Sequence, residues 1–335
     1  MTSLNRVVSR VTVMAAVLFS GCAAVPPAAI MKPATLYEAS LVNTANNQPA
    51  TPAALATQLA GADVIVIGEY HGHQAAHLLQ SRLQAALHRI RPEQVLALEA
   101  FDVDRQAVID DYLAGKLGED ELIEDAAAWD NYKASYRPLL EFARHRQAPV
   151  IAANAPADVV RCVGRHGPEY LDSLSPSRRA LLPESPFRDV PGYREKFFDR
   201  LGHNAHGEES GATRSRLENA YQAQLLRDNT MADQVLRSLQ DYPGYQVLMV
   251  TGTFHSEQRL GITAILEQRA PGLEVVVISP VILTDDDQAP APAAYRDQGD
   301  YIYFIQPLPE RFLDEQRRNA AIKHQFSKAR QQECR

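Results

Sequence analysis

Side chains that could bind a metal or transfer protons follow several apolar segments of the sequence. Two Gly-x-x-His units, Gly68–His71 and Gly252–His255, each follow a run of apolar residues, and Glu99 follows a third run. Glu69 lies within the first unit. Imidazole and carboxylate groups ligate transition metals around an open position, and they also act as general acids and bases. The glycine of each unit allows a sharp turn and the close approach of a ligand.

The apolar runs are short and rich in β-branched residues, which is typical of buried strands. Helix-length amphipathic stretches separate them, and residues 74–90 have apolar side chains at a spacing of three and four. This pattern predicts an α/β fold with a mostly parallel central sheet flanked by helices. The predicted strands are residues 64–67, 95–98, 150–152, 247–250, 275–278 and 301–305.

The polar residues after the strands are expected to meet at one edge of this sheet, because the carboxyl ends of parallel strands border the ligand crevice. Each residue alone also fits a structural role. A single histidine at a strand end is more often a hydrogen-bonding residue, and Glu69 could begin the next helix. A buried Glu99 needs a partner, for which Arg227 or His71 is available. Together these groups favour a functional site, since burying several ionisable side chains is costly.

The N-terminus has the layout of a secretory signal. Arg6 and Arg10 precede a short apolar run, and Leu18–Cys22 resembles a bacterial lipobox, in which the cysteine is lipidated and becomes the first residue. We therefore predict a lipoprotein signal peptide over residues 1–21 and a lipid on Cys22. The alternative is an ordinary signal peptide that contains a cysteine.

The rest of the chain divides into a core, an insertion and two flanking segments. Residues 157–240 contain no convincing strand and predict an inserted helical subdomain. Cys162 and Cys334 could form a disulfide, although nothing in the sequence supports this pairing. The predicted divisions are a tether at 22–57, an α/β core at 58–156 and 241–308, the helical subdomain at 157–240, and a charged tail helix at 309–335.

Composition excludes several classes of function. The 335 residues carry 34 Lys and Arg against 41 Asp and Glu, for a net charge of −7. This acidic balance argues against a nucleic acid partner, which requires a basic surface. The sequence has no Gly-x-Ser-x-Gly or Gly-x-x-x-x-Gly-Lys motif, which argues against a nucleophile-elbow serine hydrolase and a nucleotide enzyme.

Several blocks of residues resemble the ChaN-like haem-binding uptake lipoproteins of the Tiki superfamily, which are related more distantly to erythromycin esterases. The matching blocks are residues 67–71, 96–101, 136–139, 149–156, 223–228 and 252–255. The resemblance implies a lipid-anchored protein of the outer membrane that binds haem for iron uptake without catalysis. It also implies a homodimer, a tyrosine ligand to the haem iron with a histidine assisting, and an outer-membrane uptake receptor as partner.

Tyrosinate suits ferric haem iron, and cationic side chains can pair with haem propionates. The tyrosines, histidines and arginine that could serve are Tyr70, Tyr193, His203, His206 and Arg194, with Lys196 as a second cation. The alternative for Tyr193 is a place in the core of the insertion. The alternative for the two histidines is a solvated loop.

A second function is also implied, because Tiki-type relatives use the same strand-end residues for metal-dependent hydrolysis. Glu69, His71, Glu99 and His255 match that catalytic set, with His71, Glu99 and His255 as ligands of a divalent metal ion. This hypothesis predicts a peptidase or esterase.

Overall fold

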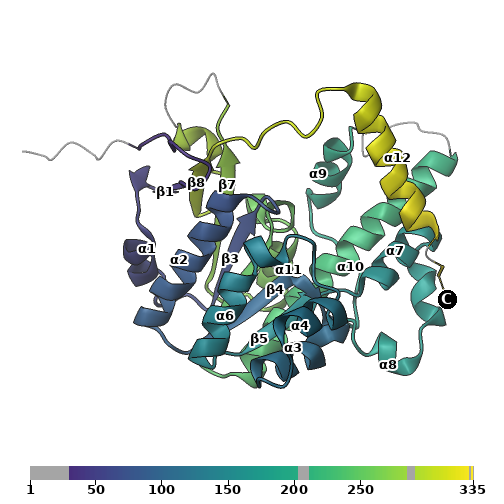
Figure 1. Ribbon diagram of the computed structural model, residues 1–335, viewed down its shortest axis with the longest axis horizontal. Helices are drawn as coiled ribbons and strands as arrows, with labels where there is room; N and C mark the ends of the chain where they lie inside the picture. The colour runs from purple at the N-terminus through teal and green to yellow at the C-terminus, as the bar shows by residue number, and fades with distance from the viewer. Residues whose placement is uncertain (1–29, 203–210, 285–290, 332, 335) are drawn as a thin grey trace, which may run out of the picture.

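The computed structural model describes residues 30–202, 211–284, 291–331 and 333–334 (Figure 1). Within these ranges, eight strands form one sheet in the order β2-β1-β8-β7-β3-β6-β4-β5. Their bounds are β1 (Ser40–Asn43), β2 (Gln48–Pro49), β3 (Val64–Glu69), β4 (Gln94–Asp102), β5 (Val150–Asn154), β6 (Gln246–Gly252), β7 (Val275–Ile282) and β8 (Tyr301–Ile305).

The sheet is parallel from β8 to β5, and only the edge pairs of β1 with β8 and of β1 with β2 are antiparallel. All six strands predicted from apolar runs form within this parallel part. The prediction of an α/β fold with a mostly parallel, helix-flanked sheet is therefore confirmed.

Both faces of the sheet are buried, which explains why its strands are apolar without alternation. On one face, Ile65 and Ile67 of β3 pack under helices that include α1 and α2. On the other face, Val64 and Val66 of the same strand pack against α10 and α11. These two helix layers lie on opposite sides of the sheet in Figure 1. The helices are α1 (Pro52–Gln58), α2 (Gln74–Ile90), α3 (Gln106–Leu113), α4 (Glu119–Asp125), α5 (Tyr132–Ser135), α6 (Arg137–Arg146), α7 (Ala157–His166), α8 (Pro176–Arg179), α9 (Tyr193–Arg200), α10 (Gly211–Asp241), α11 (Ile262–Arg269) and α12 (Glu315–Gln331).

The described part of residues 157–240 is helical and contains α7 to α10 with no strand. Helix α10 belongs to both parts of the molecule, since it packs against α7 as well as against the sheet strands β5 and β6. Short 3-10 turns complete the chain: η1 (Val103–Arg105), η2 (Pro168–Ser173), η3 (Thr253–His255), η4 (Glu257–Arg259) and η5 (Pro292–Tyr295).

The prediction of a tether over residues 22–57 is wrong from Ser40 onward. β1 pairs with β8 and buries Leu41 and Val42, and α1 buries Leu55 in the core. The Pro- and Ala-rich composition around these elements concealed a four-residue strand that is too short to give a periodic signal. The predicted signal peptide and Cys22 lie outside the described residues.

A disulfide joins Cys162 of α7 to Cys334, which follows α12, with the two Cα atoms 5.6 Å apart. It attaches the C-terminal helix, yellow in Figure 1, to the helical part of the molecule. The pairing that the sequence left open is therefore formed. None of the helices in the described ranges combines the length and apolar character needed to cross a bilayer.

Leu83 is fully buried in the core between α2 and the sheet. Truncating its side chain should therefore destabilise the protein strongly. We expect Leu83→Ala to lower the free energy of unfolding by about 2–5 kcal/mol, because it removes apolar contacts and leaves a cavity. Urea denaturation measures this, with the exposed neighbour Arg82→Ala as the control. A loss below about 1 kcal/mol in Leu83→Ala would contradict this packing.

Candidate functional site

The strand order brings the predicted site residues together, because β3, β6, β4 and β5 are consecutive neighbours in the sheet. Glu69 at the end of β3 pairs in register with Gly252 at the end of β6. A Cβ on Gly252 would lie 3.0 Å from Cε1 of His71, so a larger residue here would crowd this imidazole ring. The first glycine, Gly68, similarly makes room for the backbone of Thr253.

Glu69 is the centre of one half of the site. Its side chain is buried and accepts hydrogen bonds from the Tyr136 hydroxyl (2.5 Å), Gln80 Nε2 (2.6 Å) and His71 Nδ1 (2.9 Å). Burial alone would raise the pKa of Glu69, but the hydrogen bond from His71 and the nearby charge of His77 outweigh it and lower the pKa. Glu69 is therefore a carboxylate that orients its neighbours.

His71 differs from the other site residues because its side chain is 46% exposed. The ring lies edge-on to Trp129, with the two centroids 4.8 Å apart. Burial alone would lower the pKa of His71, but the hydrogen bond to Glu69 and the charge of Glu99 raise it above its usual value. Since Nδ1 donates to Glu69, the second ring nitrogen, Nε2, is available to an incoming group.

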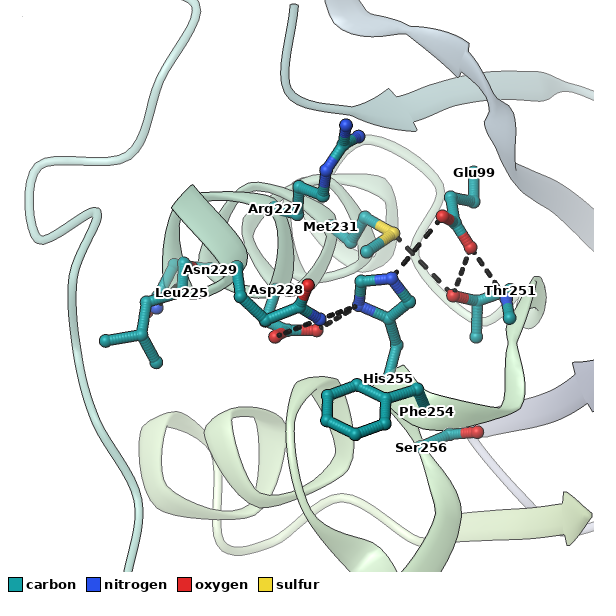
Figure 2. A network of polar contacts seen from close by, with 12 residues as sticks. Glu99, Leu225, Arg227, Asp228, Asn229, Met231, Thr251, Phe254, His255 and Ser256 are labelled. Carbon is teal, nitrogen blue, oxygen red and sulfur yellow. Dashed lines mark hydrogen bonds and ion pairs between the residues drawn. The ribbon is translucent and has the colours of Figure 1, made fainter. Parts of the chain in front are cut away.

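The other half of the site is a buried histidine between two carboxylates (Figure 2). Nδ1 of His255 lies 2.6 Å from Oδ1 of Asp228, and Nε2 lies 3.4 Å from Oε1 of Glu99. Glu99 also accepts hydrogen bonds from the Thr251 hydroxyl (2.7 Å) and from the backbone N–H of Gly252 (2.6 Å).

This environment keeps His255 charged. Burial opposes the charge, but Asp228 and Glu99 outweigh it and raise the pKa of His255 to about 10. The imidazolium in turn holds the pKa of Glu99 well below its usual value despite burial. His255 is therefore a cation that donates from both ring nitrogens.

The structure does not support the predicted divalent-metal site at His71, Glu99 and His255. A metal ligand needs a free nitrogen lone pair, and both nitrogens of His255 face carboxylates. Within the described ranges, His, Cys, Asp and Glu side chains form no group suited to a metal ion. Of the two partners expected for Glu99, Arg227 contacts Asn154 instead and points away from His255 in Figure 2. The charge of His71, the other expected partner, does help to lower the pKa of Glu99.

Tyr193 and Arg194 are not placed to hold haem. Tyr193 is fully buried, and its hydroxyl donates to Oδ2 of Asp228 at 2.6 Å, so it positions the carboxylate that faces His255. Arg194 forms an ion pair with Glu218 and lies over the ring of Phe198. The predicted ligands His203 and His206 lie outside the described residues.

Tyr70, by contrast, lines a cavity of about 880 Å³ beside the strand ends. Lys196 and Arg200 of α9 line the same cavity, and apolar side chains contribute to its wall: Phe254, Pro280, Val281 and Ile282. The Lys196 ammonium donates to the backbone oxygens of Phe254 (3.0 Å) and Glu257 (3.2 Å) and thereby fixes α9 over the loop after β6.

A sequence model of one protein family matches residues 55–266. This family is described as haem-binding uptake, Tiki superfamily, ChaN. The chain belongs to this family. Among solved structures, the chain is similar to ChaN of Campylobacter jejuni, which is described with cofacial haem. The two sequences are 16% identical and the TM-score is 0.57. The match covers 80% of this chain and 97% of the ChaN chain. It is also similar to a mutant of the erythromycin esterase EreC in its open conformation, at 14% identity and a TM-score of 0.44, covering 79% and 81%. No curated protein matches the chain significantly.

Sequence reasoning missed several residues that complete the site in this ChaN-family chain. Tyr136 and Asp228 lie in blocks 136–139 and 223–228 but were not assigned a role, although a buried ionisable group requires such partners. Arg200 gave no signal, because its place at the cavity depends on how α9 packs.

The charged state of His255 predicts a pH-dependent stability. Its pKa is raised from 6.5 to about 10, so its contribution is fully present below pH 6.5 and is lost as the pH rises through 10. We expect the free energy of unfolding of the native chain to exceed that of His255→Gln by about 3–5 kcal/mol near pH 6. This difference should shrink by roughly 1.4 kcal/mol per pH unit within that window.

Urea denaturation between pH 6 and pH 10 measures this difference. His145→Gln is the matched control, because the His145 side chain is 71% exposed. A difference between native chain and His255→Gln that stays constant over this range would contradict a charged His255.

Proposed function

We propose that this chain binds haem in the cavity lined by Tyr70, where the Tyr70 phenolate would hold the ferric iron. The observation that carries the proposal is a tyrosine at the wall of a haem-sized cavity. Among the described residues, its hydroxyl has no hydrogen-bond partner. Family membership supports the same cofactor.

The residues around the cavity fit haem. Its volume of about 880 Å³ lies in the usual range of cofactor sites. Phe254, Val281 and Ile282 offer apolar contacts to a macrocycle, while the exposed Arg200 offers a positive charge to a propionate. When bound, haem supplies a ferric iron, for which tyrosinate is a known axial ligand.

The charges near Tyr70 act in opposite directions on its ionisation. The pKa of Tyr70 is raised above its usual value, because burial and the charge of Glu257 outweigh the charge of Arg200, which lowers it. Arg200 therefore favours the phenolate that iron binding requires. Tyr70 would lose its phenol proton to solvent in order to hold ferric iron.

The proposal extends to the place where the protein acts. A lipid on Cys22 would anchor the chain in the outer membrane. There an uptake receptor would exchange haem with the chain. A homodimer is expected from the family resemblance. The disulfide between Cys162 and Cys334 favours an oxidising compartment outside the cytosol.

Haem titration of the full-length protein in mild detergent tests the ligand assignment. We expect a saturable Soret change and a phenolate-to-iron charge-transfer band. In Tyr70→Phe we expect the band to disappear and haem affinity to fall at least about tenfold, because the axial ligand is lost.

Two variants serve as controls for this titration. Tyr295→Phe alters another tyrosine of the same cavity, and Tyr193→Phe alters the buried tyrosine bound to Asp228. If either of them removes the band while Tyr70→Phe keeps it, the assignment of Tyr70 is wrong. Absorbance that rises without saturation in the native chain would overturn haem binding itself.

A second candidate function is hydrolysis by acid–base chemistry, and it rests on the half-exposed His71. A carboxylate at Nδ1 leaves Nε2 as a base that can take a proton from water. The buried pair of Glu99 and His255 lies beside it and would stabilise a protonated His71 through the Glu99 charge. This mechanism needs no metal ion.

An esterase assay with p-nitrophenyl esters tests the second candidate. We expect a rate that rises with pH through the pKa of His71, resists EDTA, and falls at least about 100-fold in His71→Ala, because the base is removed. The exposed His145→Ala is the matched control. Equal rates in both variants would reject His71 as the base.

A further inference from the structure

A second cavity, of about 320 Å³, lies between the loop after α8, helix α10 and the end of α11. It shares no lining residue with the cavity around Tyr70. Three arginines from these three elements, Arg188, Arg237 and Arg269, line it. Neither the proposed haem site nor the strand-end network uses these residues.

A buried carboxylate orients two of the three guanidinium groups. Asp233 is 6% exposed, and it lies 2.7 Å from Nη2 of Arg269 through Oδ1 and 2.8 Å from Nε of Arg237 through Oδ2. Arg237 and Arg269 remain partly exposed, and both line the cavity. Two cations are thus held in place before any ligand arrives.

The third arginine, Arg188, differs from the other two because no carboxylate orients its side chain. The Arg188 side chain is exposed and has no hydrogen bond or ion pair with any of the described residues. Its backbone is anchored, since the Arg188 carbonyl accepts a hydrogen bond from Asn229 Nδ2 at 2.9 Å. The guanidinium therefore stands at the cavity with all of its donors available.

A fourth arginine, Arg179, lies close to the cavity without lining it. Arg179 donates to the carbonyl oxygens of Leu182 and Pro183 and so shapes the loop that begins at Glu184. It also lines a neighbouring hollow that shares Glu184 and Arg237 with this cavity. Three arginines and two carboxylates thus line the cavity, a local positive excess in a chain whose net charge is −7.

We propose that this arginine cavity binds a phosphate group. Guanidinium groups that converge from three elements suit a tetrahedral anion, which can accept hydrogen bonds in several directions at once. A carboxylate, by contrast, is satisfied in one plane by a single guanidinium group. The cavity is large enough for a phosphomonoester with a small organic part as well as for free phosphate.

Isothermal titration calorimetry of the full-length protein, in detergent and 0.15 M chloride, tests the proposal with inorganic phosphate and glycerol 3-phosphate. We expect one saturable site for at least one of the two ligands. Arg188→Gln should weaken it at least about tenfold, because charge-assisted hydrogen bonds are lost. Tighter binding of glycerol 3-phosphate would identify a phosphomonoester as the source of the group, and equal affinities would indicate free phosphate.

Arg317→Gln is the matched control, since it removes one exposed positive charge from α12, away from the cavity. Both variants alter exposed side chains, and their thermal unfolding should match that of the native chain. No saturable heat with either ligand, or equal weakening in both variants, would overturn the proposal. Succinate binding as tightly as glycerol 3-phosphate would also overturn it, because the site would then not select phosphate.

Discussion

The ion triad of Glu99, His255 and Asp228 is the interaction on which the rest of the site depends. The three groups come from β4, the turn after β6 and helix α10, so they join the sheet to the helical insertion. Each buried charge is tolerated only because the others compensate it, and removing one would leave an uncompensated charge in the interior. The position of α10, and of the helices packed on it, therefore depends on this electrostatic contact.

Neighbouring residues at the strand ends serve different sites. Glu69 and His71 face the polar network, while Tyr70 between them faces the cavity. After β6, His255 belongs to the network and the preceding Phe254 lines the cavity. Fixing the network thus also fixes one wall of the cavity, and a shift of either turn by one residue would exchange the two sets of side chains.

The strands and their convergence could be predicted because both rest on local patterns and on a general rule of parallel sheets. Continuous apolar runs mark β3 to β8, and the three polar strand ends, those of β3, β6 and β4, do meet as neighbours. The short strand β1 could not be predicted from four residues, and the choice between Tyr70 and Tyr193 depends on packing. Tyr193 looks like a ligand in sequence, yet its hydroxyl is buried against Asp228.

The two Gly-x-x-His units show how the same motif acquires two roles. His255 is enclosed and faces carboxylates on both nitrogens, which makes it a structural cation. His71 faces a carboxylate on one nitrogen and remains 46% exposed, so its second nitrogen can still meet a ligand or a water molecule. The number of carboxylates around each ring, which no spacing in the sequence reveals, separates the two roles. Function in this chain is therefore expected on the side of His71 and Tyr70, where polar groups remain available to a ligand.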